Sequence, residues 1–384
     1  MTYRTVLDAL LGRRAALSTP ISPQRARLDA AAWARALRPY RLANRMRGAR
    51  ELAVTSSGFV LLAYSMLWAV ENQVLFLYAV LLLPAAGFLV RLFMIQHDCA
   101  HRSFFPSRRA NDLVGRLIGI ATLTPHDHWR MSHSFHHASS GDLDRRGIGD
   151  VYTLTVAEYL ARSRWARLRY RLYRHPAVMF GVGPLYIFLL HNRWPVGFMR
   201  KEWLPWLSTM GTNLGIVLTF ASLVAAVGLR PLLWVYVPTV VIAAVTGVWL
   251  FYVQHQFENT HWARGARWDA HEAALYGSSH YDLPTVIRWF TANIGIHNVH
   301  HLSSRIPFYR LPEVLRDHQE LRSVGRVTLL QSLRGVGLVL WDEEQRRLVS
   351  FKQLRAERGA VITSAENVTG LQHSSSAASL ADPG

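Results

Sequence analysis

The chain has 384 residues, of which 50% are hydrophobic and 18% charged, and its formal net charge is +18. The apolar residues form long blocks with the arginines between them, an arrangement typical of a membrane protein with basic cytoplasmic loops and not of a nucleic-acid-binding protein. A single cysteine, Cys99, excludes an internal disulfide framework and a cysteine-based metal site. No apolar stretch follows the first charged residues, so we expect no cleaved signal peptide.

Four segments are apolar enough and long enough to span a bilayer, which requires about 20 residues in a helix. They are residues 52–70, residues 74–90 with a few more, residues 210–229 and residues 231–253. Very short connections, at 71–73 and at 230–231, join them in two pairs. The pattern therefore predicts two transmembrane helical hairpins.

The arginines indicate the orientation of these hairpins. Both open ends of each hairpin lie on one side, together with the N-terminal residues 1–50, which contain eleven arginines, the long middle segment and the C-terminal region. Positive segments stay in the cytoplasm. We therefore predict an all-α integral membrane protein of about four spans in the cytoplasmic (inner) membrane, with a cytoplasmic helical cap and both termini in the cytoplasm.

Two shorter apolar runs and the C-terminus complete the predicted organisation. Residues 113–123 and 178–190 are shorter than a span, and we expect interfacial or re-entrant helices there. A membrane domain is expected over residues 51–320 and a cytoplasmic segment over 321–356. The Ser/Ala/Gly-rich residues 357–384 are expected to be disordered.

Three histidine clusters carry the strongest chemical signal. HDCAH follows the second span, HSFHH lies in the middle segment and HNVHH lies beyond the fourth span. Spacings of three and four residues place side chains on one helix face, about 5–6 Å apart, where two can share a metal ion. The topology brings all three clusters to one side of the membrane. Their members are His97, His101, His133, His136, His137, His297, His300 and His301.

Eight imidazoles exceed what one metal ion needs, so we predict a site for two ions. Imidazole suits zinc, copper, iron and nickel. A zinc site would use only three or four of these ligands. A redox role for so many histidines favours iron, although spacing alone leaves the metal open.

HDCAH, HSFHH and HNVHH, in this order and in these positions relative to two hairpins, resemble the three histidine boxes of the membrane-bound fatty acid desaturases. The similarity includes RANDLVGRLIG, LDRRGIGD, FYVQHQFENTHW, SSHYDLP and TANIG, and extends over residues 50–320. The short first box and a third box that opens with histidine are most similar to the bacterial acyl-lipid Δ12/omega-6 branch.

This resemblance implies an activity and its cofactors. Two ferrous ions would use O₂ as co-substrate and two external electrons to insert a cis double bond, most specifically at Δ12 of a lipid-bound monounsaturated chain. It also implies a ninth ligand, His255, at the end of the fourth span, and no catalytic residue beyond the metal ligands. No haem-binding HPGG stretch or ferredoxin-type cysteine run occurs, so the electron donor would be a separate protein of ferredoxin or cytochrome type.

Two polar residues are hypothetical supports for the ligands. Asp98 could orient a metal-bound imidazole, as carboxylates often do. In acyl-CoA relatives an asparagine one turn before the ninth ligand binds a metal through water, but this chain has Phe251 there. Asn293, one turn before His297, could provide a polar group instead.

The remaining polar residues need no chemical role. The other nine histidines are expected to be ordinary hydrogen-bonded or exposed residues, and Cys99 a packing residue. The nine are His126, His128, His175, His191, His261, His271, His280, His318 and His373.

Two other functions are compatible with the histidine pattern. A membrane di-iron hydroxylase, ketolase or alkane hydroxylase carries similar boxes. A non-enzymatic metal transporter or sensor would place polar or charged groups within its spans, and the spans here contain almost none.

Overall fold

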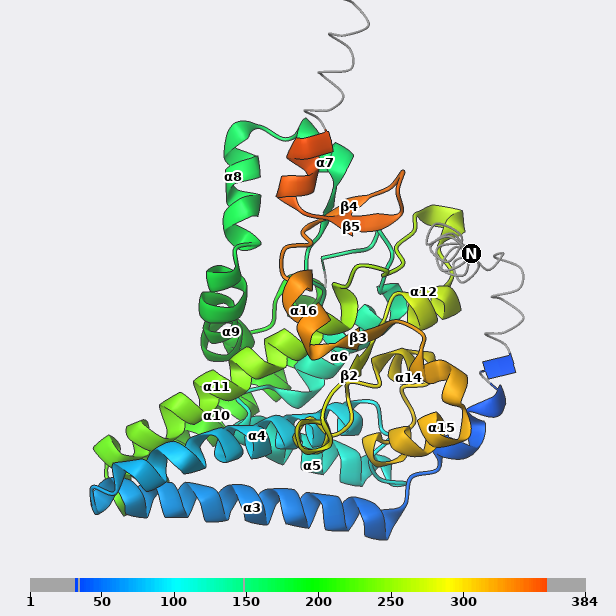
Figure 1. The fold of residues 1–384 in the computed structure, drawn as a ribbon. Helices are drawn as coiled ribbons and strands as arrows, with labels where there is room; N and C mark the ends of the chain where they lie inside the picture. Colours follow the sequence, from blue (N-terminus) through cyan, green and yellow to red (C-terminus); the bar gives the residue numbers. More distant parts are fainter. Residues whose placement is uncertain (1–31, 34, 148, 358–384) are drawn as a thin grey trace, which may run out of the picture.

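The computed structural model describes residues 32–33, 35–147 and 149–357 (Figure 1). Among these residues, four helices are long and apolar enough to cross a membrane, which confirms the four predicted spans. They are α3 (Arg45–Glu71), α4 (Leu75–Ala100), α10 (Trp203–Val227) and α11 (Leu229–His255). At 1.5 Å per residue a helix of this length measures about 39 Å, more than the hydrocarbon layer of about 30 Å, so its end can extend into the cap.

Tight turns close the two hairpins at the same end of the molecule (Figure 1). Gln73, with φ 60°, lies in the turn between α3 and α4, and Gly228, with φ 79°, lies between α10 and α11. The sequence predicted the second connection at residues 230–231, two residues after the observed turn at Gly228. Pro231 lies in the first turn of α11, where a proline removes no helical hydrogen bond.

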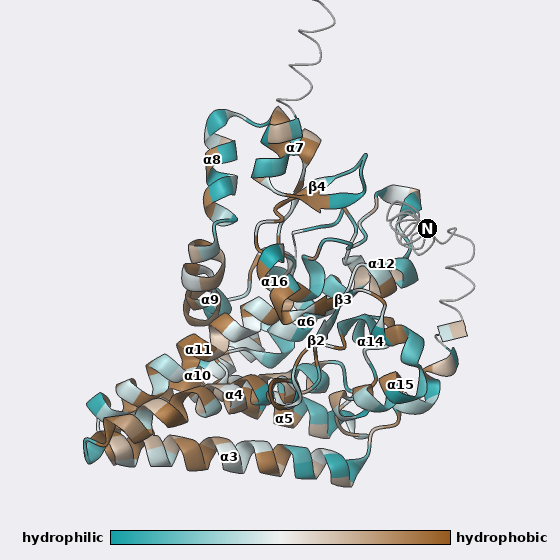
Figure 2. Ribbon diagram, viewed as in Figure 1, coloured by the Kyte–Doolittle hydropathy of each residue, from teal (hydrophilic) through white to brown (hydrophobic). Residues whose placement is uncertain are grey.

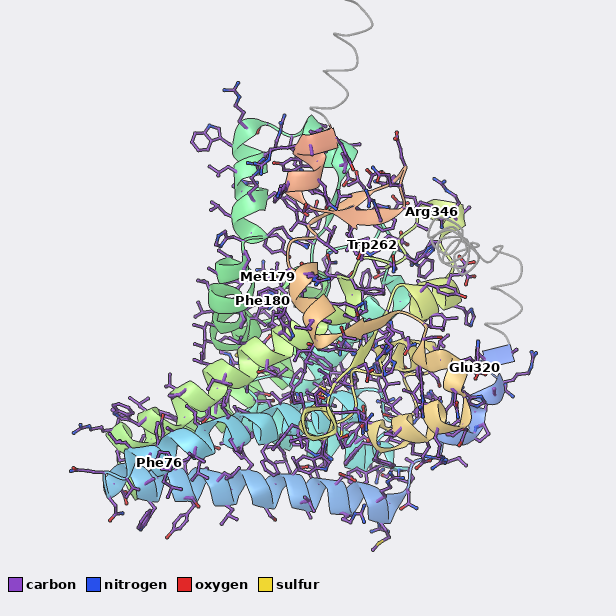
Figure 3. All side chains as sticks on the ribbon, viewed as in Figure 1. Phe76, Met179, Phe180, Trp262, Glu320 and Arg346 are labelled. Atoms are coloured by element: carbon purple, nitrogen blue, oxygen red, sulfur yellow. The ribbon has the colours of Figure 1, made fainter. Side chains whose placement is uncertain are left out.

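Hydrophobic residues predominate in the long helices, and hydrophilic residues are more frequent in the cap (Figure 2). Phe76 projects from the hairpin end of α4 with 82% of its surface exposed (Figure 3), and Leu61 of α3 is 65% exposed. The cap half of α4, from Leu89 to Ala100, is mostly buried between α3, α5 and α11. Lipid-facing helices thus surround a packed centre formed by α4 and α11.

The cap consists of short helices before α3, between the two hairpins and after α11. Before α3 lies η1 (Arg38–Arg41). Between the hairpins lie α5 (Arg108–Ala121), α6 (His126–Ser139), α7 (Val156–Ala161), α8 (Arg164–Tyr173), η2 (Val178–Val182), α9 (Gly183–Leu185), η3 (Tyr186–Leu190), η4 (His191–Arg193) and η5 (Gly197–Lys201). After α11 lie η6 (Gly265–Arg267), α12 (Ala270–Tyr276), α13 (Thr285–Phe290), α14 (His297–Leu302), η7 (Phe308–Arg310), α15 (Leu311–Asp317), η8 (Gln319–Arg322) and α16 (Leu329–Gly335).

Five short strands add to the helical architecture that the sequence predicted. They are β1 (Leu154–Thr155), β2 (His280–Asp282), β3 (Arg326–Thr328), β4 (Leu340–Asp342) and β5 (Arg347–Val349). β4 pairs in parallel with β1 and antiparallel with β5, and β2 pairs in parallel with β3. These pairings hold the C-terminal strands against the rest of the cap. Strands of two or three residues are too short to show an alternating pattern, so the sequence did not reveal them.

The two shorter apolar runs form helices below span length. Residues 113–123 lie largely in α5, which has 14 residues. Residues 178–190 form η2, α9 and η3, a series of π-helical and α-helical turns. Phe180, beside Met179 in Figure 3, packs against Trp249 and Tyr252 of α11 at ring distances of 5.1 Å. The position of these two short helical segments at the membrane surface stays a prediction. The predicted disordered tail lies, apart from Glu357, outside the described residues, as does His373.

Candidate metal centre

Four helices bring the three histidine clusters and His255 to one place. His97 lies in the last turn of α4, and His101 is the residue at which this helix ends. The second cluster lies on α6 and the third on α14. His255 is the last residue of α11. The structure therefore brings together all nine residues that the sequence and the resemblance indicated.

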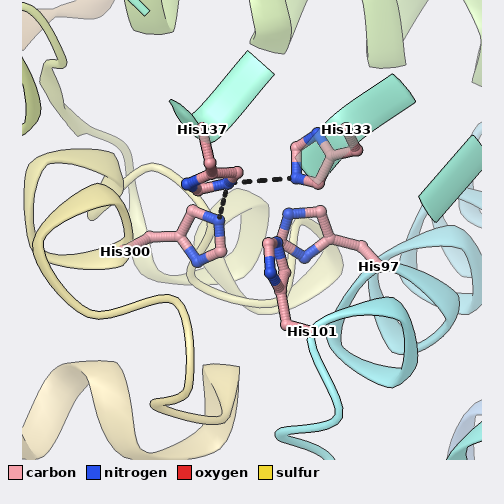
Figure 4. A group of neighbouring side chains, drawn as sticks. All are labelled: His97, His101, His133, His137 and His300. Atoms are coloured by element: carbon pink, nitrogen blue, oxygen red, sulfur yellow. Dashed lines mark hydrogen bonds between the residues drawn. The ribbon is translucent and has the colours of Figure 1, made fainter. Parts of the chain in front are cut away.

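Five of these histidines form the first group. Their ligand atoms lie within 4.8 Å of one another, and the rings from α4, α6 and α14 face a common centre (Figure 4). The Nε2 atom of His137 lies 3.2 Å from that of His133 and 3.1 Å from that of His300. The members of this group are His97, His101, His133, His137 and His300.

The other four histidines form a second group beside the first. The Nε2 atom of His255 lies 3.1 Å from Nε2 of His136 and 3.1 Å from Nε2 of His297. His301 completes this group, and its ring stacks on His137 of the first group at 4.1 Å. Two adjacent groups of five and four ligands match the requirement of two metal ions.

Hydrogen bonds at the far side of three rings show which nitrogen faces the centre. The Nδ1 atom of His97 lies 3.1 Å from a carboxylate oxygen of Asp98, and Nδ1 of His136 lies against a carboxylate oxygen of Asp150. Nδ1 of His255 lies 3.4 Å from the carbonyl oxygen of Gly277. An ionised carboxylate only accepts hydrogen bonds, so the His136 ring beside Asp150 carries its proton on Nδ1 and a lone pair on Nε2. The Gly277 carbonyl favours the same tautomer for His255, whose Nδ1 also lies 3.4 Å from the Ser140 hydroxyl.

The donor set fits bound cations. With this assignment, His136 and His255 direct two lone pairs at each other across 3.1 Å. Two imidazole nitrogens held at right angles by bonds of about 2.1 Å would lie about 3 Å apart. A metal ion between the rings converts a repulsive contact into two coordinate bonds.

Buried nitrogens without partners support the same conclusion. Within the described part of the chain, the Nε2 atoms of His97, His101 and His301 are buried and have no hydrogen-bond partner. Such atoms are rare in proteins because each loses its hydration without replacement. A metal ion in each group would satisfy all three.

The environment keeps the imidazoles in the neutral form that binds metals. Burial lowers the pKa of six histidines of the two groups well below the usual value near 6.5, and the neighbouring imidazoles act in the same direction. A metal ligand must be deprotonated. At neutral pH these six histidines can therefore bind a metal ion without first losing a proton. They are His101, His133, His137, His297, His300 and His301.

Two carboxylates support the centre, and the sequence indicated only one of them. Asp98 contacts His97 and also accepts a hydrogen bond from the backbone amide of Phe308 at 2.6 Å. Asp150, which contacts His136, was not predicted; it ends the stretch LDRRGIGD, 14 residues after its partner. The side-chain amide of Asn293 donates to the carbonyl of Phe308 at 3.2 Å, and among the described contacts no hydrogen bond joins that amide to His297.

Aromatic rings cover the side of the centre that faces the spans. The Phe251 ring lies 5.1 Å from that of His136 and 5.3 Å from that of His255, so an apolar group fills the position where the acyl-CoA relatives have asparagine. The Trp129 ring stacks on His133 at 4.3 Å. The sequence alone did not indicate Trp129, because a tryptophan four residues before His133 is not part of a metal-ligand pattern.

A third group of potential ligands is already neutralised. His126 lies with Asp112 and Asp127, and their ligand atoms are within 4.8 Å of one another. Arg130, however, binds Asp112 at 2.8 Å and Asp127 at 2.9 Å, and Arg116 binds Asp127 at 2.8 Å. The positive charges occupy the carboxylates, which disfavours a cation here. Burial lowers the pKa of His126 to about 4, so it is a neutral packing residue.

Comparison with known proteins identifies the family. The family model for fatty acid desaturases matches residues 72–327. A fatty acid desaturase of Bacillus subtilis is 46% identical over 272 residues, which are 71% of this chain and 76% of that protein.

More distant relatives carry more specific names. An sn-1 oleoyl-lipid 12-desaturase of Synechocystis is 29% identical over 57% of this chain, and an sn-1 acyl-lipid omega-3 desaturase (ferredoxin) of the same organism is 30% identical over 57%. The chain spans 62% and 61% of these two proteins. The matched residues include the second, third and fourth of the four spans and all three histidine clusters. The chain belongs to the fatty acid desaturase family of membrane oxidoreductases.

Proposed function

We propose that this desaturase inserts a cis double bond into a long acyl chain of a membrane lipid at a di-iron centre. The observation that carries the proposal is the pair of adjacent histidine groups, five and four ligands, in a chain of this family. The proposed ligands are His97, His101, His133, His136, His137, His255, His297, His300 and His301.

The side chains around the proposed centre have separate roles. When bound, the two ferrous ions supply the activation of O₂ and the oxidising power needed to remove two hydrogens from neighbouring CH₂ groups, which no side chain can do. The nine imidazoles hold the ions, and Asp98 and Asp150 fix the tautomer and orientation of His97 and His136. Phe251 and Trp129 keep water away from the side that faces the spans.

The reaction needs two electrons from a partner. The sequence contains neither a haem-binding HPGG stretch nor a run of cysteines, so we propose a separate donor protein of ferredoxin or cytochrome type. The omega-3 relative from Synechocystis is named as a ferredoxin enzyme, which supports the first of these.

We also propose that the protein lies in the cytoplasmic membrane with its termini and its metal centre in the cytoplasm. The described hairpin turns contain few charges, and, apart from Arg91 and Arg230, the arginines lie in the cap and the termini. This distribution follows the positive-inside rule. The substrate and the surrounding lipids would reach the protein from the bilayer.

For the position of the new bond we propose Δ12 of a lipid-bound monounsaturated chain. The support is the form of the first and third histidine boxes and the names of the 12-desaturase relatives. The name of the Bacillus subtilis relative gives no position. An existing cis bond fixes a kink in the substrate, which lowers the ordering cost when a rigid site binds it.

Expression in a host that makes only saturated and monounsaturated fatty acids tests this function. The lipids are converted to methyl esters, and mass spectrometry of their dimethyl disulfide adducts locates each double bond. We expect dienes with a new bond at Δ12. A new monoene from saturated chains would refute Δ12 and retain the desaturase, whereas products heavier by one oxygen would indicate a hydroxylase.

A further inference from the structure

The cap helix α8 carries an exposed apolar stripe between basic residues. Trp165, Leu168 and Leu172 are 77%, 44% and 54% exposed, and their spacings of three and four residues place them on one face of the helix. Arg164 and Arg169 flank this stripe and are also exposed. We call these five residues the α8 face. Tryptophan and leucine on one side of a helix, with arginines beside them, are typical of helices that lie in a membrane interface.

The opposite side of α8 is fixed to the cap. The buried Tyr170 donates its hydroxyl hydrogen to the carbonyl oxygen of Val339 and accepts a hydrogen bond from the backbone amide of Leu154 at 3.1 Å. In Figure 1, α7 and β4 lie on one side of α8, and the hairpin turns lie on the other. The α8 face therefore points away from the cap, toward the side on which the spans cross the bilayer.

Contacts with α11 place the end of α8 at the level of the bilayer surface. Arg174, the residue at which α8 ends, donates to the side-chain oxygen of Gln256 at 3.0 Å and to the Tyr252 hydroxyl at 3.3 Å. From Leu229 to Tyr252, α11 rises about 35 Å, slightly more than the hydrocarbon layer of about 30 Å. Because α8 runs across the direction of the spans (Figure 1), its whole length stays near the level of the lipid head groups.

A second cap helix, α16, exposes apolar residues at the same level. The Tyr252 hydroxyl lies 3.3 Å from the carbonyl oxygen of Gly335, the last residue of α16. Leu329, Leu330 and Leu333 of this helix are 43%, 71% and 57% exposed. Two cap helices that meet the same residue of α11 thus both expose leucines, as expected of a cap that rests on a membrane.

The segment that follows α8 connects this helix to the surface of the spans. Phe180 of η2 packs on Trp249 of α11 at a ring distance of 5.1 Å. Beyond it, Val182, Tyr186 and Leu190 are 63%, 54% and 53% exposed. An exposed apolar surface therefore continues from the α8 face to the spans, which are surrounded by lipid.

The arginines of α8 differ from other cap arginines because they have no carboxylate partners. No aspartate or glutamate occurs between Glu158 and Glu202. None of the ion pairs between described residues includes an arginine of α8, whereas Arg264 pairs with Asp144, Glu158 and Glu343. Positive charge that the protein does not compensate attracts anions from outside, and each basic residue near an anionic membrane surface strengthens its binding.

We propose that α8 lies in the head-group layer of the cytoplasmic leaflet and binds anionic phospholipids. Trp165, Leu168 and Leu172 enter the boundary of the acyl region, and Arg164 and Arg169 bind lipid phosphate groups. Arginines alone would suit an acidic protein equally well. The apolar stripe and its continuity with the spans favour the membrane, because exposed leucines gain free energy when lipid removes them from water.

Fluorescence quenching by spin-labelled lipids tests the depth of α8. The full-length Leu168→Cys variant is labelled with the fluorophore NBD and placed in nanodiscs of phosphatidylcholine and phosphatidylglycerol; Cys99 is buried and escapes the label. Lipids with a nitroxide near the head group should quench most of the fluorescence. The control is Glu344→Cys in the exposed turn between β4 and β5, which carries Arg346 in Figure 3, and its label should stay unquenched. An unquenched label in Leu168→Cys would overturn the inference.

Substitution of the arginines tests the choice of head group. The label at residue 168 is titrated with spin-labelled phosphatidylglycerol in nanodiscs of phosphatidylcholine. Arg164→Gln and Arg169→Gln should each raise the lipid fraction for half-maximal quenching by about fivefold, the usual effect of one basic residue at an anionic surface. The matched control, Arg267→Gln in η6, changes another exposed arginine and should leave the titration unaltered. Titrations of Arg164→Gln and Arg169→Gln that equal the wild type would overturn the phosphate contacts.

Quenching requires neither iron nor turnover, so its result is independent of the proposed reaction. The elution volume shows whether each variant is folded, and Leu172→Cys on the same face replaces Leu168→Cys if that variant is not. An acidic electron donor is the alternative occupant. An unquenched label, together with weaker binding of a ferredoxin to Arg169→Gln than to the wild type, would assign the α8 face to the donor and refute the membrane contact.

Discussion

The Nε2 atoms of His136 and His255 lie 3.1 Å apart, and hydrogen-bond acceptors, the Asp150 carboxylate and the Gly277 carbonyl, lie at the Nδ1 atoms of these rings. Two lone pairs at this distance repel unless a cation lies between them. This contact supports the proposal that metal ions complete the site, with the rings held in place by carboxylates and by packing.

Metal removal should therefore destabilise the protein as well as inactivate it. A ligand present at 100 times its dissociation constant stabilises the folded state by about 2.7 kcal/mol, and the metal-free rings lose that contribution and repel. We expect a chelator to lower the unfolding temperature in detergent and ferrous iron to restore it. Equal unfolding temperatures with and without iron would contradict this role.

Asp150, which the sequence did not reveal, should affect metal binding as much as Asp98, which the sequence indicated. Asp150→Asn removes the charge that orients His136, and such changes usually cost about 10–100-fold in metal affinity or activity. Asp98→Asn should have an effect of the same order through His97. The control is Asp144→Asn, which removes a surface ion pair with Arg264 at 2.7 Å. Iron retention during dialysis measures all three variants.

A buried ion pair should stabilise the contact between the first two spans and the cap. Arg91, on α4, binds Glu51 of α3 at 2.6 Å and lies over the Trp289 ring at 4.1 Å. Removing one partner of a buried pair costs about 3–5 kcal/mol because the other charge remains unpaired. Arg91→Met should therefore lower the unfolding temperature strongly, and Glu51→Gln added to it should recover part of the loss. A double variant no more stable than Arg91→Met would contradict this explanation.

The proposed orientation of the protein in the membrane depends on the two hairpins. Reporter fusions after Asn72, in the first hairpin turn, and after Glu357, at the end of the described chain, should report opposite sides of the membrane. The second should report the cytoplasm. Reports from the same side would mean that the chain crosses the membrane an odd number of additional times.

Much of this arrangement could be predicted from the sequence because its signals are local. Apolar length revealed the four spans, and spacing revealed the eight clustered histidines; the ninth, His255, came from the family resemblance. The sequence underestimated the lengths of α3, α4 and α10. The ends of these helices at the cap are less apolar, and their helical structure depends on tertiary contacts. The sequence also placed one hairpin turn two residues late, since it did not show that Gly228 would adopt φ 79°.

What the sequence could not reveal depends on the packing of distant segments. Asp150 follows its partner by 14 residues across a loop, and Trp129 is recognised only by its stacking on His133. The strands pair segments far apart in the chain, Leu154 with Leu340 for example.

We propose that nine histidines hold two iron ions and that this centre is needed to desaturate an acyl chain. The most direct test is the ratio of iron to protein in a preparation that desaturates lipid, measured for the wild type, for His300→Ala and for the exposed control His271→Ala. We predict two iron ions per active chain, their loss together with activity in His300→Ala, and both retained in the control. Full activity in His300→Ala, or in a wild-type preparation without iron, would contradict the claim.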